Sequence, residues 1–185
     1  MLKRGLVVAA LVALADQLSK GGLLWFFGEP WLAGPGPSPP PHPVTGFFNL
    51  VLTWNRGVSF GLGNFALFNN ETATAVLFMG AAAMIVTGLV VWLRRTQEPF
   101  LAFALGLVIG GAIGNVVDRL LRSAVVDFLD FHWDQWAVCD WSRHWLNCHF
   151  FAFNLADSAI SVGVALMVID GLRAQREAPN REAGV

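Results

Sequence analysis

The sequence predicts an all-α membrane protein, built from four transmembrane helices with a small β-structure outside the cytoplasm. Of its 185 residues, 55% are hydrophobic and 14% are charged, whereas about a quarter of the residues of a soluble domain are charged. Four stretches approach the roughly 20 apolar residues that a membrane span requires: 6–27, 72–93, 100–121 and 153–172. We therefore expect a single membrane-embedded domain over residues 1–185, with outer loops at 28–71 and 122–152.

The positive charges predict how this bundle is oriented. Lys3 and Arg4 precede the first span, Arg94 and Arg95 separate the second from the third, and Arg173 follows the fourth. Because loops rich in Lys and Arg stay in the cytoplasm, both termini should be cytoplasmic. Although the basic N-terminus resembles a cleavable signal peptide, the apolar run continues further, and we expect it to remain as the first span.

The spans differ in their expected roles. The second carries no charge and is expected to be scaffold, while Gly106, Gly110, Gly111 and Gly114 give the third span faces for close helix packing. In the first outer loop, residues 33–43 are rich in proline, which excludes helix. Residues 46–63 combine β-branched and aromatic residues with glycine, which predicts one or two short strands. Such strands belong at the outer surface, because lipid cannot satisfy a bare strand edge.

Ionisable groups in apolar surroundings are the candidate functional residues, since their burial is costly. Asp16 and Lys20 share a face of the first span and can pair there, either as structure or as part of a site. The third span ends with Asn115, Asp118 and Arg119, and the fourth opens with Asn154 and Asp157.

Four acids could supply a pair of carboxylates: Asp118, Asp127, Asp130 and Asp157. Hydrolysis by such a pair needs one group as a base toward water and the other as a proton donor. Asp118 adjoins Arg119, so we assign it to structure, bonded to Asp16, Lys20 or Asn115. We expect Asp130 to be hydrated in the outer loop. Asp127 and Asp157 remain as the preferred pair, although each could simply cap or solvate a helix end.

The outer loop at 132–149 is rich in tryptophan and holds both cysteines, Cys139 and Cys148. A disulfide is allowed outside the cytoplasm. Zinc is the competing hypothesis, with His132, Cys139, His144, Cys148 and His149 as ligands. Their spacing matches no common zinc motif, so we expect no metal and no cofactor. Proteins that bind nucleic acid typically carry a basic patch, and the net charge of −1 argues against such a function. We expect a monomer that binds no nucleic acid.

Five motifs, in this order, give the chain a resemblance to the lipoprotein signal peptidase (signal peptidase II) family. They are DQLSK at 16–20, Asn55-Arg56-Gly57, GGAIGNVVDR at 110–119, VVDFLDF at 125–131 and FNLADS at 153–158. The resemblance implies a four-helix bundle with a small β-cradle in the bacterial inner membrane. It also implies an aspartyl endopeptidase without metal, whose active site lies at the outer face. Its substrate would be a diacylglyceryl-modified prolipoprotein, cut on the amino side of the lipidated Cys.

The same resemblance assigns individual residues. Asp127 and Asp157 match the family's catalytic pair, Asp16 and Lys20 match its first-span motif, and Asp118 lies within the third motif. Positions that line or brace the family's site are matched by Asn55, Gly57, Gly110, Asn115, Arg119, Asn154 and Ala156. The proline-rich and tryptophan-rich loop segments are longer than is usual in the family that the chain resembles.

One alternative function class is a small transporter or channel. In that interpretation Asp16, Lys20, Asp118 and Arg119 form a polar path across the bundle. The concentration of polar groups in the outer half argues against it.

Overall fold

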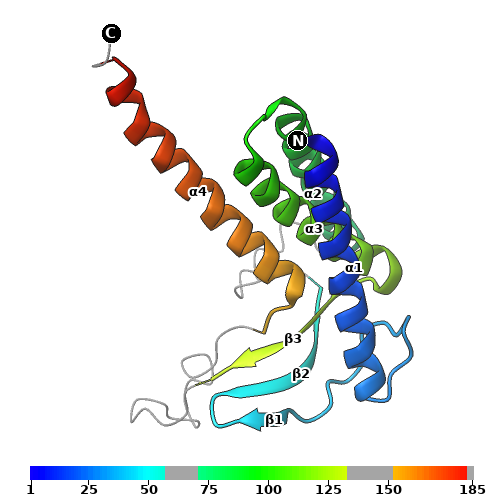
Figure 1. Cartoon of the computed structure of the whole chain (residues 1–185). Coiled ribbons are helices and arrows are strands. Elements are labelled where there is room, and N and C mark those ends of the chain that lie inside the picture. The colour runs from blue at the N-terminus through cyan, green and yellow to red at the C-terminus, as the bar shows by residue number, and fades with distance from the viewer. Residues whose placement is uncertain (57–70, 133–151, 183–185) are drawn as a thin grey trace. The chain divides into compact units, whose positions relative to one another are not determined.

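The computed structural model describes residues 1–56, 71–132 and 152–182 (Figure 1). In chain order the elements are α1 (Leu2–Phe26), β1 (His42–Thr45), β2 (Phe48–Asn55), α2 (Glu71–Arg95), α3 (Pro99–Arg122), β3 (Val125–Phe131) and α4 (Leu155–Glu182). The chain folds into two compact units. Unit 1 comprises residues 1–16, 81–114 and 155–185, and unit 2 comprises residues 17–80 and 115–154.

Unit 1 is helical, and its hydrophobic cluster is purely aliphatic. Its buried cluster consists of Ala9, Leu93, Ala102, Leu105 and Ile109. Long uninterrupted helices suit these apolar segments, because lipid leaves a backbone to satisfy its own hydrogen bonds. Three helices among the described residues are long and apolar enough to cross a membrane: Leu2–Phe26, Pro99–Arg122 and Leu155–Gln175. They coincide with the predicted first, third and fourth spans, and α2 is a helix where the second was predicted.

Glycines on α3 let neighbouring helices approach closely. A Cβ at Gly110 would lie 2.5 Å from the carbonyl oxygen of Ala9 on α1, and one at Gly111 would lie 2.4 Å from that of Ala156 on α4. Any side chain at either position would therefore push the helices apart. The predicted role of these small residues in close packing is confirmed.

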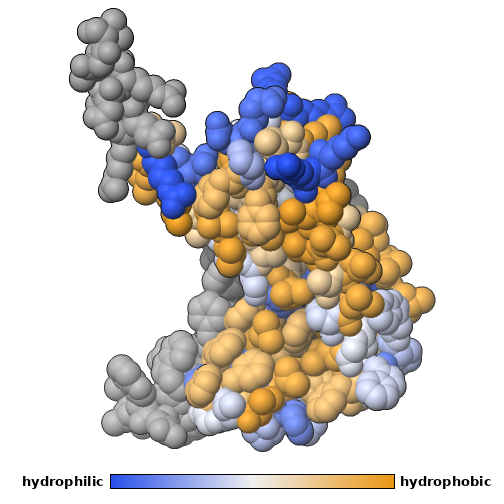
Figure 2. Space-filling view, in the orientation of Figure 1, coloured by the Kyte–Doolittle hydropathy of each residue, from blue (hydrophilic) through white to orange (hydrophobic). Residues whose placement is uncertain are grey.

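The surface of unit 1 changes character along its helices. Hydrophobic side chains cover most of the helices, and hydrophilic ones gather at the end that carries the N-terminus and the connection between α2 and α3 (Figure 2). That connection follows the basic pair Arg94 and Arg95. An apolar body with a charged end matches the pattern of a bilayer-embedded bundle.

Unit 2 contains a three-stranded antiparallel sheet in the order β1-β2-β3 (Figure 1). The strand predicted from residues 46–63 corresponds to β2, while β1 begins earlier, at the end of the proline-rich segment. The segment VVDFLDF forms β3, which the sequence analysis did not identify as a strand. Five of its seven residues are buried, so β3 lacks the alternation of polar and apolar residues that marks a half-exposed strand.

The sheet packs on the C-terminal part of α1. Leu23 and Leu24 from α1 form a buried cluster with Leu52 of β2 and with Val126 and Phe128 of β3. Side chains alternate across a strand. Because Val126 and Phe128 enter this cluster, the residue between them, Asp127, is directed to the other face of β3.

Substitution of Gly110 tests the close packing of α3. We expect Gly110→Val to lower the free energy of unfolding by about 1–3 kcal/mol, as overpacking typically does. The matched control is Gly88→Val on α2, where a Cβ would meet nothing within 4 Å. Thermal unfolding of both variants in detergent is the measurement. Equal unfolding temperatures would show that the contact with Ala9 is not tight.

Candidate active site

Asp127 lies on β3 beside the segment that precedes α4. Phe153 forms a two-residue bridge with Leu129, with hydrogen bonds of 2.8 Å from the Leu129 N–H to the Phe153 carbonyl and 3.1 Å in the reverse direction. This antiparallel bridge brings the next residue, Asn154, alongside Asp127. Local backbone pairing therefore assembles residues from two separate motifs.

Both carboxylate oxygens of Asp127 accept hydrogen bonds from side-chain amides. Asn154 donates from Nδ2 to Oδ1 over 2.7 Å, and Asn55 at the end of β2 donates from Nδ2 to Oδ2 over 3.0 Å. Asp127 is 2% exposed, and Asn154 is fully buried. Two directed donors in a dry environment fix the plane of the carboxylate and stabilise its negative charge.

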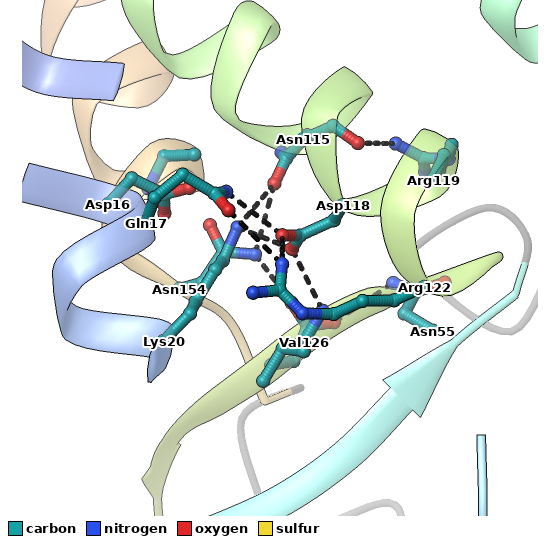
Figure 3. A network of polar contacts seen from close by, with 12 residues as sticks. Asp16, Gln17, Lys20, Asn55, Asn115, Asp118, Arg119, Arg122, Val126 and Asn154 are labelled. Carbon is teal, nitrogen blue, oxygen red and sulfur yellow. Dashed lines mark hydrogen bonds and ion pairs between the residues drawn. The ribbon is translucent and has the colours of Figure 1, made fainter. Parts of the chain in front are cut away.

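A chain of hydrogen bonds continues from Asp127 into the helices of unit 2 (Figure 3). Asn154 Nδ2 also donates to Oδ1 of Asn115 on α3, over 3.2 Å. The same oxygen accepts from Nζ of Lys20 on α1, over 3.1 Å. The resulting order is Lys20, Asn115, Asn154, Asp127 and Asn55, so a buried cation anchors one end of the amide chain.

Asp118 is the centre of a second cluster, which shares Lys20 with the first (Figure 3). Its Oδ2 lies 2.8 Å from Lys20 Nζ, and its Oδ1 lies 2.5 Å from Nη1 of Arg122. Gln17 Nε2 donates to Oδ1 over 2.9 Å, and the backbone N–H of Val126 donates to Oδ2 over 3.1 Å. The predicted contact between Asp118 and Lys20 is present, and the structural role of Asp118 stays a prediction.

Sequence reasoning missed two members of this cluster, Arg122 and Gln17, and misjudged the exposure of Asp130. Arg122, which falls at the start of the predicted outer loop 122–152, is the last residue of α3 and is 2% exposed. Its position four residues after Asp118 was an available signal, since such pairs share a helix face. Gln17 lies inside the DQLSK motif but was not singled out. Asp130, expected to be hydrated, is 6% exposed because it lies on a packed strand and accepts a 3.0 Å bond from Asn49.

Two further predicted site residues, Asp16 and Ala156, meet at the start of α4. The Ala156 N–H donates to Oδ1 of Asp16 over 2.9 Å, and Asp16 is fully buried. Gly114 makes room for this carboxylate, since a Cβ there would lie 2.5 Å from Oδ2. Asp157 lies in the first turn of α4, where the positive end of the helix dipole favours an anion.

Some of the other predicted residues lie within the described part of the chain, and some lie outside it. Arg119 donates from Nη1 to the backbone carbonyl of Asn115 over 3.2 Å. Gly57 lies outside the described residues. Of the five side chains considered for zinc, His132 is described and buried; Cys139, His144, Cys148 and His149 fall in the undescribed segment.

Helices of this length and apolarity give the chain the character of a membrane protein. The buried Asp127 carboxylate, held by two amides, is a candidate catalytic group. The sequence profile of the family described as Signal peptidase (SPase) II matches residues 8–173, so the chain belongs to the signal peptidase II family and is an aspartic peptidase. Membership of a peptidase family does not favour the alternative hypothesis that the protein is a transporter or channel.

Relatives and solved structures agree with this assignment. The chain is 41% identical over 169 residues to the lipoprotein signal peptidase of Burkholderia vietnamiensis, which covers 91% of this chain and 87% of the relative. It is 42% identical over 171 residues to that of Paraburkholderia phymatum, covering 92% and 89%. A bacterial membrane enzyme solved by the in meso method at 2.3 Å superposes with a TM-score of 0.66 and 25% identity, covering 92% of this chain and 88% of that structure.

Removal of the Asp118 charge tests the second cluster. We expect Asp118→Asn to lower the free energy of unfolding by about 3–5 kcal/mol, because Lys20 and Arg122 would lose the anion that compensates their burial. Denaturant titration in mixed micelles is the measurement. The control is Asp170→Asn on α4, a partly exposed acid. If the two variants were equally stable, the cluster would not contribute to stability.

Proposed function

We propose that this peptidase uses Asp127 and Asp157 as its catalytic pair and cuts prolipoproteins at the outer face of the bacterial inner membrane. Membership of the family makes the removal of signal peptides from prolipoproteins its activity. The observation that carries the assignment of the site is the Asp127 carboxylate, buried and held at both oxygens by Asn55 and Asn154.

Asp127 is linked to Asp157 through Asn154, which lies close to Asp157 in the sequence. Asn154, which binds Asp127, precedes Asp157 by three residues within FNLADS. Asp157 lies in the first turn of α4, so a rigid helix carries its side chain. In this proposal the backbone bridge at Phe153 and the bond between Ala156 and Asp16 support the start of α4. Catalytic groups on such rigid elements hold their geometry better than groups on loops.

The proposed chemistry adds one water molecule across the peptide bond. One carboxylate takes a proton from water as its oxygen attacks the scissile carbonyl carbon, and the protonated acid donates to the carbonyl oxygen. The tetrahedral intermediate then collapses, the carbon–nitrogen bond breaks, and the departing amine receives a proton. Two amide donors hold the Asp127 carboxylate in place, and in this proposal Asp127 and Asp157 share the roles of base and acid.

The substrate is proposed to be a prolipoprotein that carries diacylglycerol on its cysteine, cut on the amino side of that residue. Its acyl chains would remain in the bilayer beside the apolar helices. We also propose that α2 crosses the membrane as the second span, that both termini are cytoplasmic and that the sheet lies on the outer side. The basic residues of unit 1 support this orientation. The protein is proposed to work as a monomer.

Substitution of the two acids tests the catalytic assignment. We expect Asp127→Asn and Asp157→Asn to reduce cleavage of a diacylglyceryl-prolipoprotein at least about 10³-fold, as loss of a catalytic group typically does. The mass of the product identifies the cleaved bond, and Asp170→Asn on the same helix as Asp157 should retain wild-type activity. A folded variant of Asp127 or Asp157 that still cuts at the wild-type rate would rule out the pair.

Reporter fusions test the topology. A fluorescent protein fused after residue 182 should fluoresce, and alkaline phosphatase fused there should be inactive, because we expect this end in the cytoplasm. Fusions after Arg95, at the end of α2, should behave in the same way. Active phosphatase at both positions would show that α2 does not cross the membrane as proposed.

A further inference from the structure

Arg122 is a buried arginine that no motif of the family resemblance includes. It closes α3, is 2% exposed and is one of the largest fully buried side chains described. Arginine is almost never fully buried unless it is paired. We therefore expect this buried cation to have a specific role, and the contacts of its guanidinium group indicate that role.

The guanidinium group of Arg122 connects three separate segments of unit 2. Nη1 contacts Asp118 Oδ1 and donates to Gln17 Oε1 over 3.1 Å. Nε donates to the backbone carbonyl of Trp31 over 3.0 Å. Its central carbon also lies 5.8 Å from the centre of the Trp31 ring, within the range of a cation–π contact. A planar group with several fixed donors can make these contacts together, whereas the compact ammonium of lysine cannot.

Asp118 transmits this arrangement to the strand that carries Asp127. Its Oδ1 is held by Arg122, and its Oδ2 accepts the backbone N–H of Val126. Val126 is the residue directly before Asp127. Only Ser123 and Ala124 separate α3 from β3, and Ser123 adopts a left-handed conformation with φ of 61°. A carboxylate fixed at the end of α3 therefore fixes the start of β3.

The strand needs this support because its pairing is irregular near Asp127. The register between β2 and β3 shifts between Leu50 and Thr53, and Thr53 is the partner of Asp127. Such bulges locally disrupt the ladder and re-aim side chains. Displacement of a catalytic group by about 1 Å can cost about 100-fold in rate.

We propose that Arg122 is a positioning residue for the peptidase reaction. Its guanidinium holds Asp118 so that the Val126 N–H, and with it the Asp127 carboxylate, stays in the productive orientation. The inference rests on the proposed function, in which Asp127 is catalytic. The charges predict that loss of Arg122 is compatible with folding, because Lys20 still pairs with Asp118 over 2.8 Å.

The test compares Arg122→Met and Arg122→Lys with the wild type in the cleavage assay. Arg122→Met removes the charge and all donors, and we expect kcat to fall about 10- to 100-fold while KM changes less than about twofold. Arg122→Lys keeps the charge without the planar fork, and its kcat should lie between those of Arg122→Met and the wild type. Arg95→Met, at the exposed end of α2, is the matched control and should keep wild-type kinetics.

A second measurement follows the hydrogen bond between the Val126 N–H and Asp118, through which Arg122 is proposed to act on Asp127. Hydrogen–deuterium exchange at the Val126 amide should be faster in Arg122→Met than in the wild type, and unchanged in Arg95→Met. A merely structural role would instead lower the amount of folded enzyme and leave kcat per folded molecule unchanged.

Three results would overturn the inference: wild-type kcat in folded Arg122→Met, a rise in KM with unchanged kcat, or full kcat in Arg122→Lys. If Arg122→Met does not fold, the kcat of Arg122→Lys and its Val126 exchange decide the matter. Asp127→Asn is measured in parallel. Activity in that variant would refute the proposed function itself, separately from the behaviour of Arg122.

Discussion

The Asp118 carboxylate is the constraint on which unit 2 depends. It receives one cation from α1, a second from its own helix α3 and a backbone N–H from β3. A buried charge is costly without such partners, so these contacts allow the three elements to be buried together. Because the N–H belongs to the residue before Asp127, the same interaction that stabilises the unit also orients the candidate site.

The chain of hydrogen bonds from Lys20 to Asn55 orients the side chains of this site. Asn154 uses its Nδ2 group for two acceptors, Asp127 and Asn115, and the oxygen of Asn115 is turned toward Lys20. Each asparagine is therefore held in one orientation by the next group. Such chains polarise one another in a medium of low dielectric, so the carboxylate of Asp127 is placed by a network that reaches back to the first helix.

Much of the fold was predictable, because hydropathy and small residues directly reflect the energetics of a bilayer. Polar residues such as Asn115 and Asn154 also stood out, since their apolar surroundings make them costly. Strand β3 was not predictable in the same way, because burial on both faces removes the alternation that periodicity detects. Arg122 and Asp130 were misjudged for a related reason: proximity to a loop in sequence says little about burial once a strand folds over it.

The double use of these side chains also limits which substitutions the chain can accept. A substitution at Asn154 removes two hydrogen bonds at once, one to Asp127 and one to Asn115. Such a change therefore loosens the support of the Asp127 carboxylate and the contact with α3 together, so the two cannot be altered independently at this position.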